Sequence, residues 1–291
     1  MNWFLLSLGC AFFTSTTAAL SKILLKKRAL FFVGWLRFAF SLPFVMILYL
    51  ILRPDMHFTA SFWKTVMVLL PLEVMAFLLY LKALKMAPIS LVFPLLGLTP
   101  AFTIATSYIL LGEKVGAQGI AGVITVSIGA YLLNVDTIHK GFLEPFKSIF
   151  SQKGSVLMII VAFLFSLTAV MGKRVVAMSS PLSFATVYYV IFFSVLSVIT
   201  FARRKNPEKA ERITKKDIVL FGALGASFTT AVLLHFHAVL LTNVAYMISV
   251  KRLSLMMSVF YGAIIFKEEK IRYRLLGASV MVCGVLLLAF A

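Results

Sequence analysis

The chain has little charge and very little acid. Charged residues make up only 13% of its 291 residues, and only 10 residues are aspartate or glutamate. Hydrophobic residues make up 62%, and the mean hydropathy is +1.03. Soluble globular domains do not have this balance, so the composition indicates a polytopic membrane protein.

Cysteine and histidine are also scarce. Cys10 and Cys283 both lie in apolar runs and read as small packing residues, which excludes a disulfide framework. The four histidines have no metal-ligand spacing such as HExxH, and no acid/base cluster converges in the sequence. We therefore predict no metal, no cofactor and no catalytic residues, and we expect that the protein is not an enzyme.

The net charge of +18 does not indicate nucleic-acid binding. The basic residues lie in short stretches between apolar runs, where they act as topology signals. Most of them follow the odd-numbered apolar runs, as in the Arg203–Lys216 cluster. The positive-inside rule then places both termini outside the cytosol.

Apolar runs long enough to cross a bilayer recur along the whole chain. A spanning helix needs about 20 residues. We predict helices because an open sheet would leave backbone N–H and C=O groups without hydrogen bonds in lipid. The predicted spans cover residues 3–25, 30–52, 64–84, 88–111, 117–135, 155–173, 182–202, 217–240, 244–266 and 272–290. The predicted fold is therefore all-α, with ten transmembrane helices.

The two halves of the chain repeat one another. A shift of 155 residues places Glu113 on Glu268 and Gly129 on Gly284 without a gap. Five helices per half is an odd number, so the second half must enter the membrane upside down. Inverted repeats with a substrate site between them are typical of secondary transporters.

This repeat divides the chain into three parts. We expect one five-helix repeat over residues 1–135 and a second over residues 154–291. Residues 136–153 join them, and their spaced apolar residues suggest a short interfacial helix.

Two stretches carry a family resemblance. FPLLGLTPAFTIATSYILLGEKVGAQGIAGVITVSIGAYLL, which begins at Phe93, and its partner FYGAIIFKEEKIRYRLLGASVMVCGVLLL resemble the paired EamA-type repeats of the drug/metabolite transporter superfamily. Trp35-Leu36-Arg37-Phe38 resembles an Arg-Phe position common in that superfamily. The resemblance implies a carrier of amino acids, drugs, nucleotide sugars or sugar phosphates. It also implies termini in the cytosol, which disagrees with the charge bias.

Lys251 and Arg252 are adjacent cations within the predicted span 244–266. A charge near the bilayer centre costs about 2.5–3.5 kcal/mol on insertion scales, so an acid, a water-filled cavity or an anionic ligand must offset them. Ser254 and Ser258 follow on the face of Lys251. The pair is similar to the phosphate-binding pair of triose-phosphate and nucleotide-sugar carriers, which implies an anionic substrate. The alternative is a structural pair neutralised by Glu73.

The other candidate residues lie in earlier predicted spans. Glu73 follows Pro71 and serves either as a proton-coupling site or as a counter-ion of Arg37 or Lys251. Arg37 is a second coupling or counter-ion candidate, with a structural role as the alternative. Tyr80 shares the face of Glu73, and Thr99 and Thr103 line the fourth span, the repeat mate of the ninth. These hydroxyls are either substrate contacts or helix–helix hydrogen bonds.

Together these features predict a secondary active transporter that moves a small anionic or zwitterionic metabolite by alternating access. The alternatives are a flippase for a lipid-phosphate-linked sugar, or an exporter of neutral amino acids or drugs with a structural Lys-Arg pair. We expect a multi-pass protein of the cell membrane, specifically a bacterial inner membrane. Its expected partners are the metabolite, the lipid bilayer and a coupling proton or exchanged solute, and its expected state is a monomer or homodimer.

Overall fold

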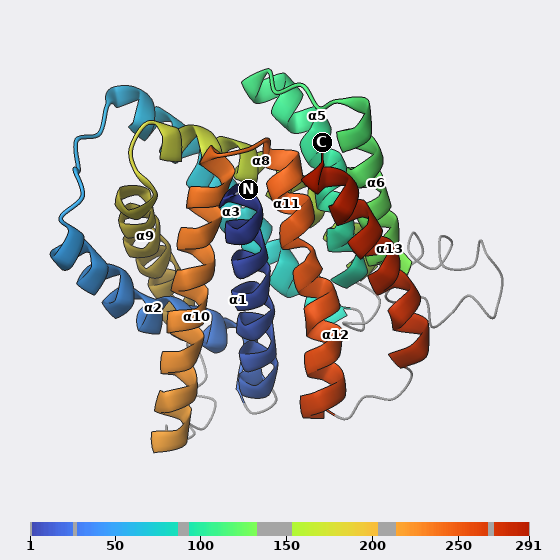
Figure 1. The fold of residues 1–291 in the computed structure, drawn as a ribbon. Helices are drawn as coiled ribbons and strands as arrows, with labels where there is room; N and C mark the ends of the chain where they lie inside the picture. The colour runs from blue at the N-terminus through green and yellow to red at the C-terminus, as the bar shows by residue number, and fades with distance from the viewer. Residues whose placement is uncertain are drawn as a thin grey trace.

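The computed structural model describes residues 2–25, 28–86, 93–132, 153–202, 214–266 and 271–290. Regular structure within these ranges is helical, with no strand (Figure 1). The predicted interfacial helix in the linker lies outside the described residues. The helical fold follows from the long apolar runs, because a helix pairs its own backbone groups.

The helices follow the predicted segments in order. In the first half they are α1 (Asn2–Leu25), α2 (Leu30–Leu52), α3 (Ala60–Met86), the 3₁₀ helix η1 (Phe93–Leu98), α5 (Thr99–Leu111) and α6 (Ala117–Leu132). In the second half they are α8 (Lys153–Ala177), α9 (Pro181–Ala202), α10 (Lys215–Leu240), α11 (Val244–Lys251), α12 (Leu253–Phe266) and α13 (Ile271–Ala289).

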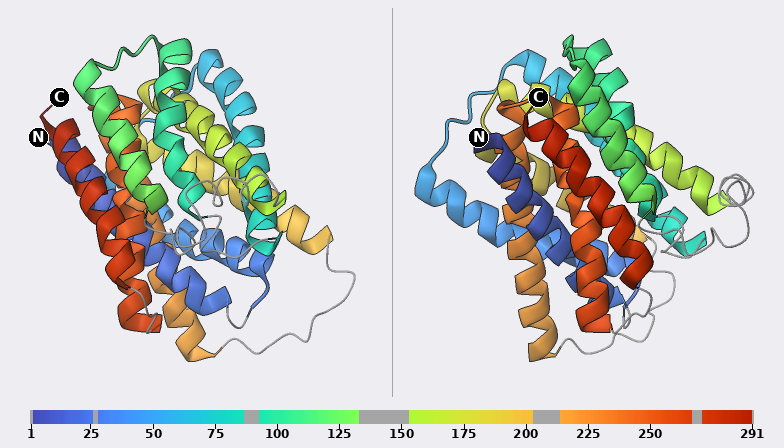
Figure 2. Two further views of the ribbon diagram at one scale, coloured as in Figure 1. Left: turned by 90° about the vertical axis from the view of Figure 1, so that its right-hand side faces the viewer. Right: turned by 45° about the vertical axis from the view of Figure 1, so that its right-hand side comes forward.

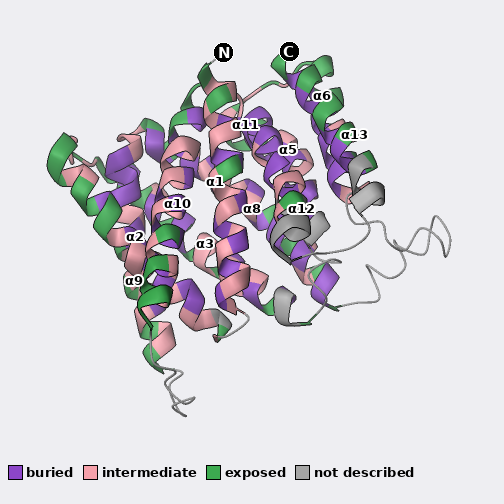
Figure 3. Cartoon of the chain, turned by 60° about the horizontal axis from the view of Figure 1, so that its bottom comes forward, coloured by how far each residue is buried: buried purple, intermediate pink, exposed green. Residues whose placement is uncertain are grey.

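Six of these helices are long and apolar enough to cross a membrane: α1, α2, α3, α8, α9 and α10. Shorter apolar helices cover Leu95–Leu111, Ala117–Leu132 and Leu276–Ala289. Large apolar side chains such as Ile51, Met67 and Val219 are about 70% exposed, and Figure 3 shows exposed residues along the helices. Such surfaces suit a lipid environment, so the protein is a multi-pass membrane protein.

The ninth predicted segment was expected to be a single helix over residues 244–266, but the structure divides it into two helices. α11 ends at Lys251 and α12 begins at Leu253. Arg252 between them keeps helical torsion angles, φ −68° and ψ −11°. Its carbonyl accepts a hydrogen bond of 2.9 Å from the N–H of Leu255, three residues later. A break confined to one residue leaves the apolar periodicity intact, which is why the sequence did not reveal it.

The fourth segment is interrupted at the equivalent place. The 3₁₀ helix η1 ends at Leu98, and α5 starts at Thr99 with Pro100 in its first turn. Proline has no N–H and is accommodated at the start of a helix. α5 starts at Thr99 and α12 at Leu253, 154 residues later, so the 155-residue repeat places the two interruptions within one residue of each other.

The packing of α6 on α13 follows the same register. A Cβ atom on Gly129 would lie 2.5 Å from the Met281 nitrogen, and one on Gly284 would lie 2.7 Å from the Val126 nitrogen. The repeat places Val126 on Met281 and Gly129 on Gly284, so the two contacts are equivalent. Residue numbers rise along α6 as they fall along α13, so the two helices are antiparallel neighbours (Figure 1).

Other neighbours also come in equivalent pairs. α1 lies beside α10 and α3 beside α8, while α2 lies beside α9. An aromatic core joins α2 to α9, where the rings of Phe38 and Phe192 stack at 4.6 Å. The two chain ends lie on the same side of the molecule (Figure 2).

Thr214 and Asp217 form the N-terminal cap of α10. The Thr214 hydroxyl accepts the Asp217 N–H at 3.2 Å, and the Asp217 carboxylate accepts the Thr214 N–H at 3.0 Å. Thr214→Ala should lower the free energy of unfolding by about 1 kcal/mol. Thr125→Ala on α6, where an exposed hydroxyl bonds only its own helix, is the control and should change little. Equal losses of thermal stability in both variants would contradict a capping role.

Candidate functional site

The two helix interruptions meet in the middle of the molecule. The Arg252 guanidinium donates a hydrogen bond of 2.8 Å to the Thr99 hydroxyl. Thr99 is itself buried, and its hydroxyl donates to the Leu96 carbonyl at 2.8 Å. The structure therefore brings together two of the predicted site residues, one from each half of the chain.

Lys251 has no anionic partner in the part of the chain that the structure describes. Among the described residues its ammonium group forms neither a hydrogen bond nor an ion pair. The Nε atom of Arg252 is also buried without a hydrogen-bond partner. Two neighbouring cations are therefore only partly compensated within the protein, and unpaired buried charge is costly.

Glu73 lies near this pair without contacting it directly. It is within electrostatic range of Lys251 and close to the Thr168 hydroxyl. In the part of the chain that the structure describes, Glu73 forms no ion pair. An attraction across a gap compensates less than a contact does, because Coulomb energy falls with distance.

Arg37 of α2 lies near the same group of residues. Its guanidinium donates to the Ser21 hydroxyl at 2.8 Å and lies 5.3 Å from the centre of the Phe228 ring. Tyr80 is within electrostatic range of both Arg37 and Arg252. Tyr80 therefore lies close enough to both arginines to feel their charge.

We call these five residues the central charged cluster: Arg37, Glu73, Tyr80, Lys251 and Arg252. They come from three elements, α2, α3 and the α11–α12 interruption. Each keeps partial solvent accessibility although it lies deep among the helices. The cluster therefore gathers polar side chains that are deep in the helix bundle but not completely shielded.

The remaining predicted residues are placed differently. Thr103 is fully buried, and its hydroxyl donates to the Thr99 carbonyl within α5. Ser254 is buried at the start of α12. The side chain of Ser258 lies outside the described residues. Thr103 thus uses its hydroxyl within its own helix.

His235 was not among the predicted site residues. It lies within electrostatic range of Lys251 and Arg252, and its Nδ1 atom is 3.1 Å from the Met247 sulfur. The repeat contained a signal for it, because a shift of 155 residues places Tyr80 on His235. Equivalent positions of the two halves therefore both present a polar ring to the cluster.

An ion pair joins the two halves near the start of α11. Lys173 of α8 contacts Glu113, which follows α5, at 2.5 Å and donates to the Thr242 carbonyl at 2.7 Å. The second Glu113 oxygen accepts the Val244 N–H at 2.9 Å. Glu113 and Lys173 therefore hold the segment Thr242–Val244 at the start of α11, the helix that carries Lys251.

The comparison with known families agrees with this geometry. The model of the EamA-like transporter family matches residues 1–135 and 152–290. The chain belongs to the EamA-like transporter family. Its members are transporters, so the protein is a membrane transporter of small solutes, and the resemblance predicted from the sequence is confirmed.

A solved structure, described only as a crystal structure of a protein, has the same fold. It is 14% identical, with a TM-score of 0.76, and the match covers 98% of this chain and 95% of that chain. At this identity the likeness concerns the fold alone. No curated protein matches the chain.

Proposed function

We propose that this family member is a secondary active transporter that moves a small anionic or zwitterionic metabolite by alternating access. The observation that supports it most is Lys251, which has no ion-pair partner among the described residues and lies beside Arg252 at the interruption between α11 and α12. An anion bound there would offset the cost of the two cations. Arginine offers a planar fork for carboxylate or phosphate, and lysine adds a point charge.

The proposed architecture is ten spans in two inverted repeats. The repeat relates α6 to α13, and these two helices are antiparallel. A two-fold axis that relates them must be perpendicular to both helices, and it lies in the membrane plane because the helices cross the membrane. Chain ends on one side of the molecule agree with an even number of spans (Figure 2). Interrupted helices that face each other near the axis are a common site for substrate in such folds.

The other cluster residues have proposed supporting roles. Tyr80 and Thr99 position the guanidinium groups, and both can contact a bound anion. Glu73, which is near Lys251 but not paired with it, would gain a proton or lose its attraction to Lys251 as the anion arrives. That competition would couple substrate to protons, with Arg37 of α2 as the compensating charge.

The test is ligand-induced thermal stabilisation of the protein in lipid nanodiscs. Amino acids, organic acids and phosphorylated metabolites would be compared on the wild type, on Lys251→Met/Arg252→Met, and on Lys82→Met. Lys82 is an exposed cation on α3 and serves as the control. We expect an anionic compound to stabilise the wild type and the control, with at least a tenfold loss of apparent affinity in the double variant.

Two results would contradict the proposal. One is equal stabilisation of the wild type and the double variant by the same anion. The other is stabilisation of the wild type by neutral or cationic compounds only. Either result would leave the cation pair with a structural role.

A further inference from the structure

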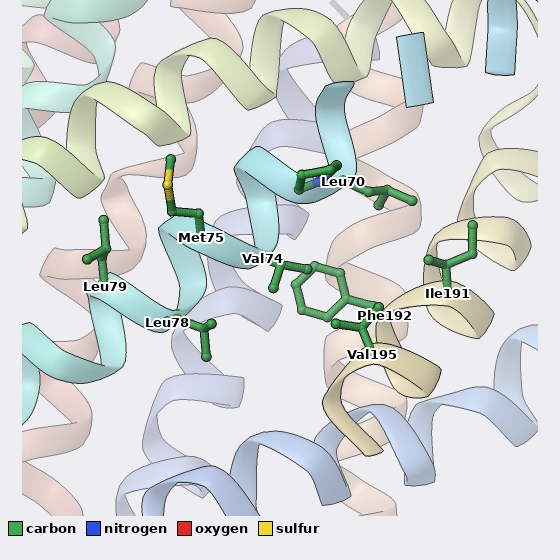
Figure 4. Close-up of a pocket in the computed structure, with 9 residues that line it drawn as sticks. Leu70, Val74, Met75, Leu78, Leu79, Ile191, Phe192 and Val195 are labelled. Carbon is green, nitrogen blue, oxygen red and sulfur yellow. The ribbon is translucent and has the colours of Figure 1, made fainter. Parts of the chain in front are cut away.

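An apolar groove runs between α3 and α9 (Figure 4). Its volume is about 630 Å³. Its lining consists only of apolar residues: Leu70, Pro71, Val74, Met75, Leu78, Leu79, Ile191, Phe192 and Val195. Met75 in this lining is 43% exposed, so the groove opens at the lipid-facing surface of two spanning helices.

The equivalent interface between two helices, here called a seam, is closely packed in the other half. Under the repeat, the seam between α3 and α9 corresponds to the seam between α10 and α2. There a Cβ atom on Gly225 would lie 2.6 Å from the Phe40 carbonyl carbon and 2.9 Å from the Ser41 nitrogen. The Ser41 hydroxyl also donates to the Gly225 carbonyl at 3.3 Å. The backbones of α10 and α2 are therefore in direct contact.

The amino-acid sequence explains why only one seam closes. The shift of 155 residues places Gly225 on Leu70, which lines the groove. Glycine permits backbone-to-backbone contact, whereas a leucine side chain at the same place holds the helices apart. The groove thus follows from a sequence difference between two otherwise equivalent helix interfaces.

The rings of Phe192 and Tyr188 lie between the groove and the central charged cluster. Phe192 lines the groove and lies 5.1 Å from the Tyr188 ring, centroid to centroid. Tyr188 in turn is within electrostatic range of Glu73 and Arg37. Moreover, α3 supplies both Leu70 of the groove and Glu73 of the cluster. An apolar site open to the bilayer therefore adjoins a site for anions.

We propose that the groove holds the hydrocarbon chain of the transported anion, so that the substrate is an amphipathic anion. Its headgroup would bind at Lys251 and Arg252, as in the proposed function on which this inference rests. Its chain would displace the rings of Tyr188 and Phe192 and lie between α3 and α9. An apolar lining fits a hydrocarbon chain, and the adjacent cations Lys251 and Arg252 fit its headgroup. The opening to the bilayer lets the chain remain in lipid during transport.

Hexadecyl phosphate and hexadecanoate test the chain, with inorganic phosphate and acetate as chainless probes. Each would be titrated against nanodisc-embedded protein with thermal stabilisation as the readout. Val195→Trp fills the groove, and Met75→Trp fills it from the other helix. Val198→Trp is the matched control, because Val198 is 69% exposed on α9 and does not line the groove.

We expect at least one long-chain anion to stabilise the wild type. Val195→Trp and Met75→Trp should weaken its apparent affinity at least tenfold, while Val198→Trp leaves it unchanged. The chainless anion should bind all three variants equally. Lys251→Met/Arg252→Met should weaken the long-chain and the chainless anion alike.

Three results would overturn the inference. The first is that neither long-chain anion stabilises the wild type. The second is that a long-chain anion binds the groove variants and the control variant with equal affinity. The third is that uncharged hexadecanol binds as tightly as the anions and with the same dependence on the groove, which would make the groove a plain lipid site. None of these affects the proposed function if a chainless anion still depends on Lys251 and Arg252. Loss of that dependence would instead count against the proposed function.

Discussion

Gly129→Ala and Gly284→Ala should each destabilise the protein strongly, by about 3 kcal/mol. The added Cβ atom at Gly129 would lie 2.5 Å from the Met281 nitrogen and 2.8 Å from the Gly277 oxygen. These are backbone atoms of α13, which cannot yield as a flexible side chain can. The two helices would have to separate along their whole contact. The thermal unfolding midpoint should fall by about 6–12 °C.

Gly172→Ala and Gly222→Ala are the matched controls for this prediction. Both glycines lie inside helices, and a Cβ atom on either meets nothing within 4 Å. Alanine is preferred over glycine in a helix interior by about 1 kcal/mol, so these variants should be slightly more stable than the wild type. Equal midpoints in the two groups of variants would show that the α6–α13 contact is looser than described.

Lys173→Met should also cause a large loss of stability. The Lys173 and Glu113 side chains are only 19% and 11% exposed, and removal of one partner of a buried ion pair costs about 3–5 kcal/mol. The variant leaves the Glu113 carboxylate without its cation next to the start of α11. We expect the unfolding midpoint to fall by about 10 °C and transport to fall with it, because α11 carries Lys251.

The double variant Glu113→Gln/Lys173→Met tests the reason for that loss. Glutamine keeps an oxygen that can accept the Val244 N–H, and no unpaired charge remains. The double variant should therefore recover at least half of the stability lost in Lys173→Met. Lys153→Met, which removes an exposed cation at the start of the same helix, is the control. If the double variant were less stable than Lys173→Met, the unpaired carboxylate would not be the cause.

The positions of the spans were predictable because they depend on local sequence. The length of an apolar run is decisive when lipid offers no hydrogen bonds, and α2 and α10 begin and end within two residues of the prediction. The register of the repeat was also predictable. It made Gly129 equivalent to Gly284, which both pack between α6 and α13, and it made the fourth span, with Thr99, the mate of the span with Arg252.

The contacts of the buried charges were not predictable in the same way. Glu73 was a candidate counter-ion of Arg37 or Lys251, yet in the structure Arg37 contacts Ser21 and Phe228, and Lys251 stands apart. Which charges meet depends on how each helix is rotated about its axis. That rotation is set by packing against helices far away in sequence, which a residue pattern does not record.

By itself, then, the sequence determined the membrane class, the order of the helices, the two-fold repeat and the identity of the intramembrane charges. Each of these follows from the composition or spacing of residues along one chain. Only the tertiary structure decided that the ninth helix breaks at Arg252, that Lys251 has no ion-pair partner among the described residues, and that one seam stays open beside Leu70. The physical reason is close packing: a single side chain between two helices decides whether their backbones touch.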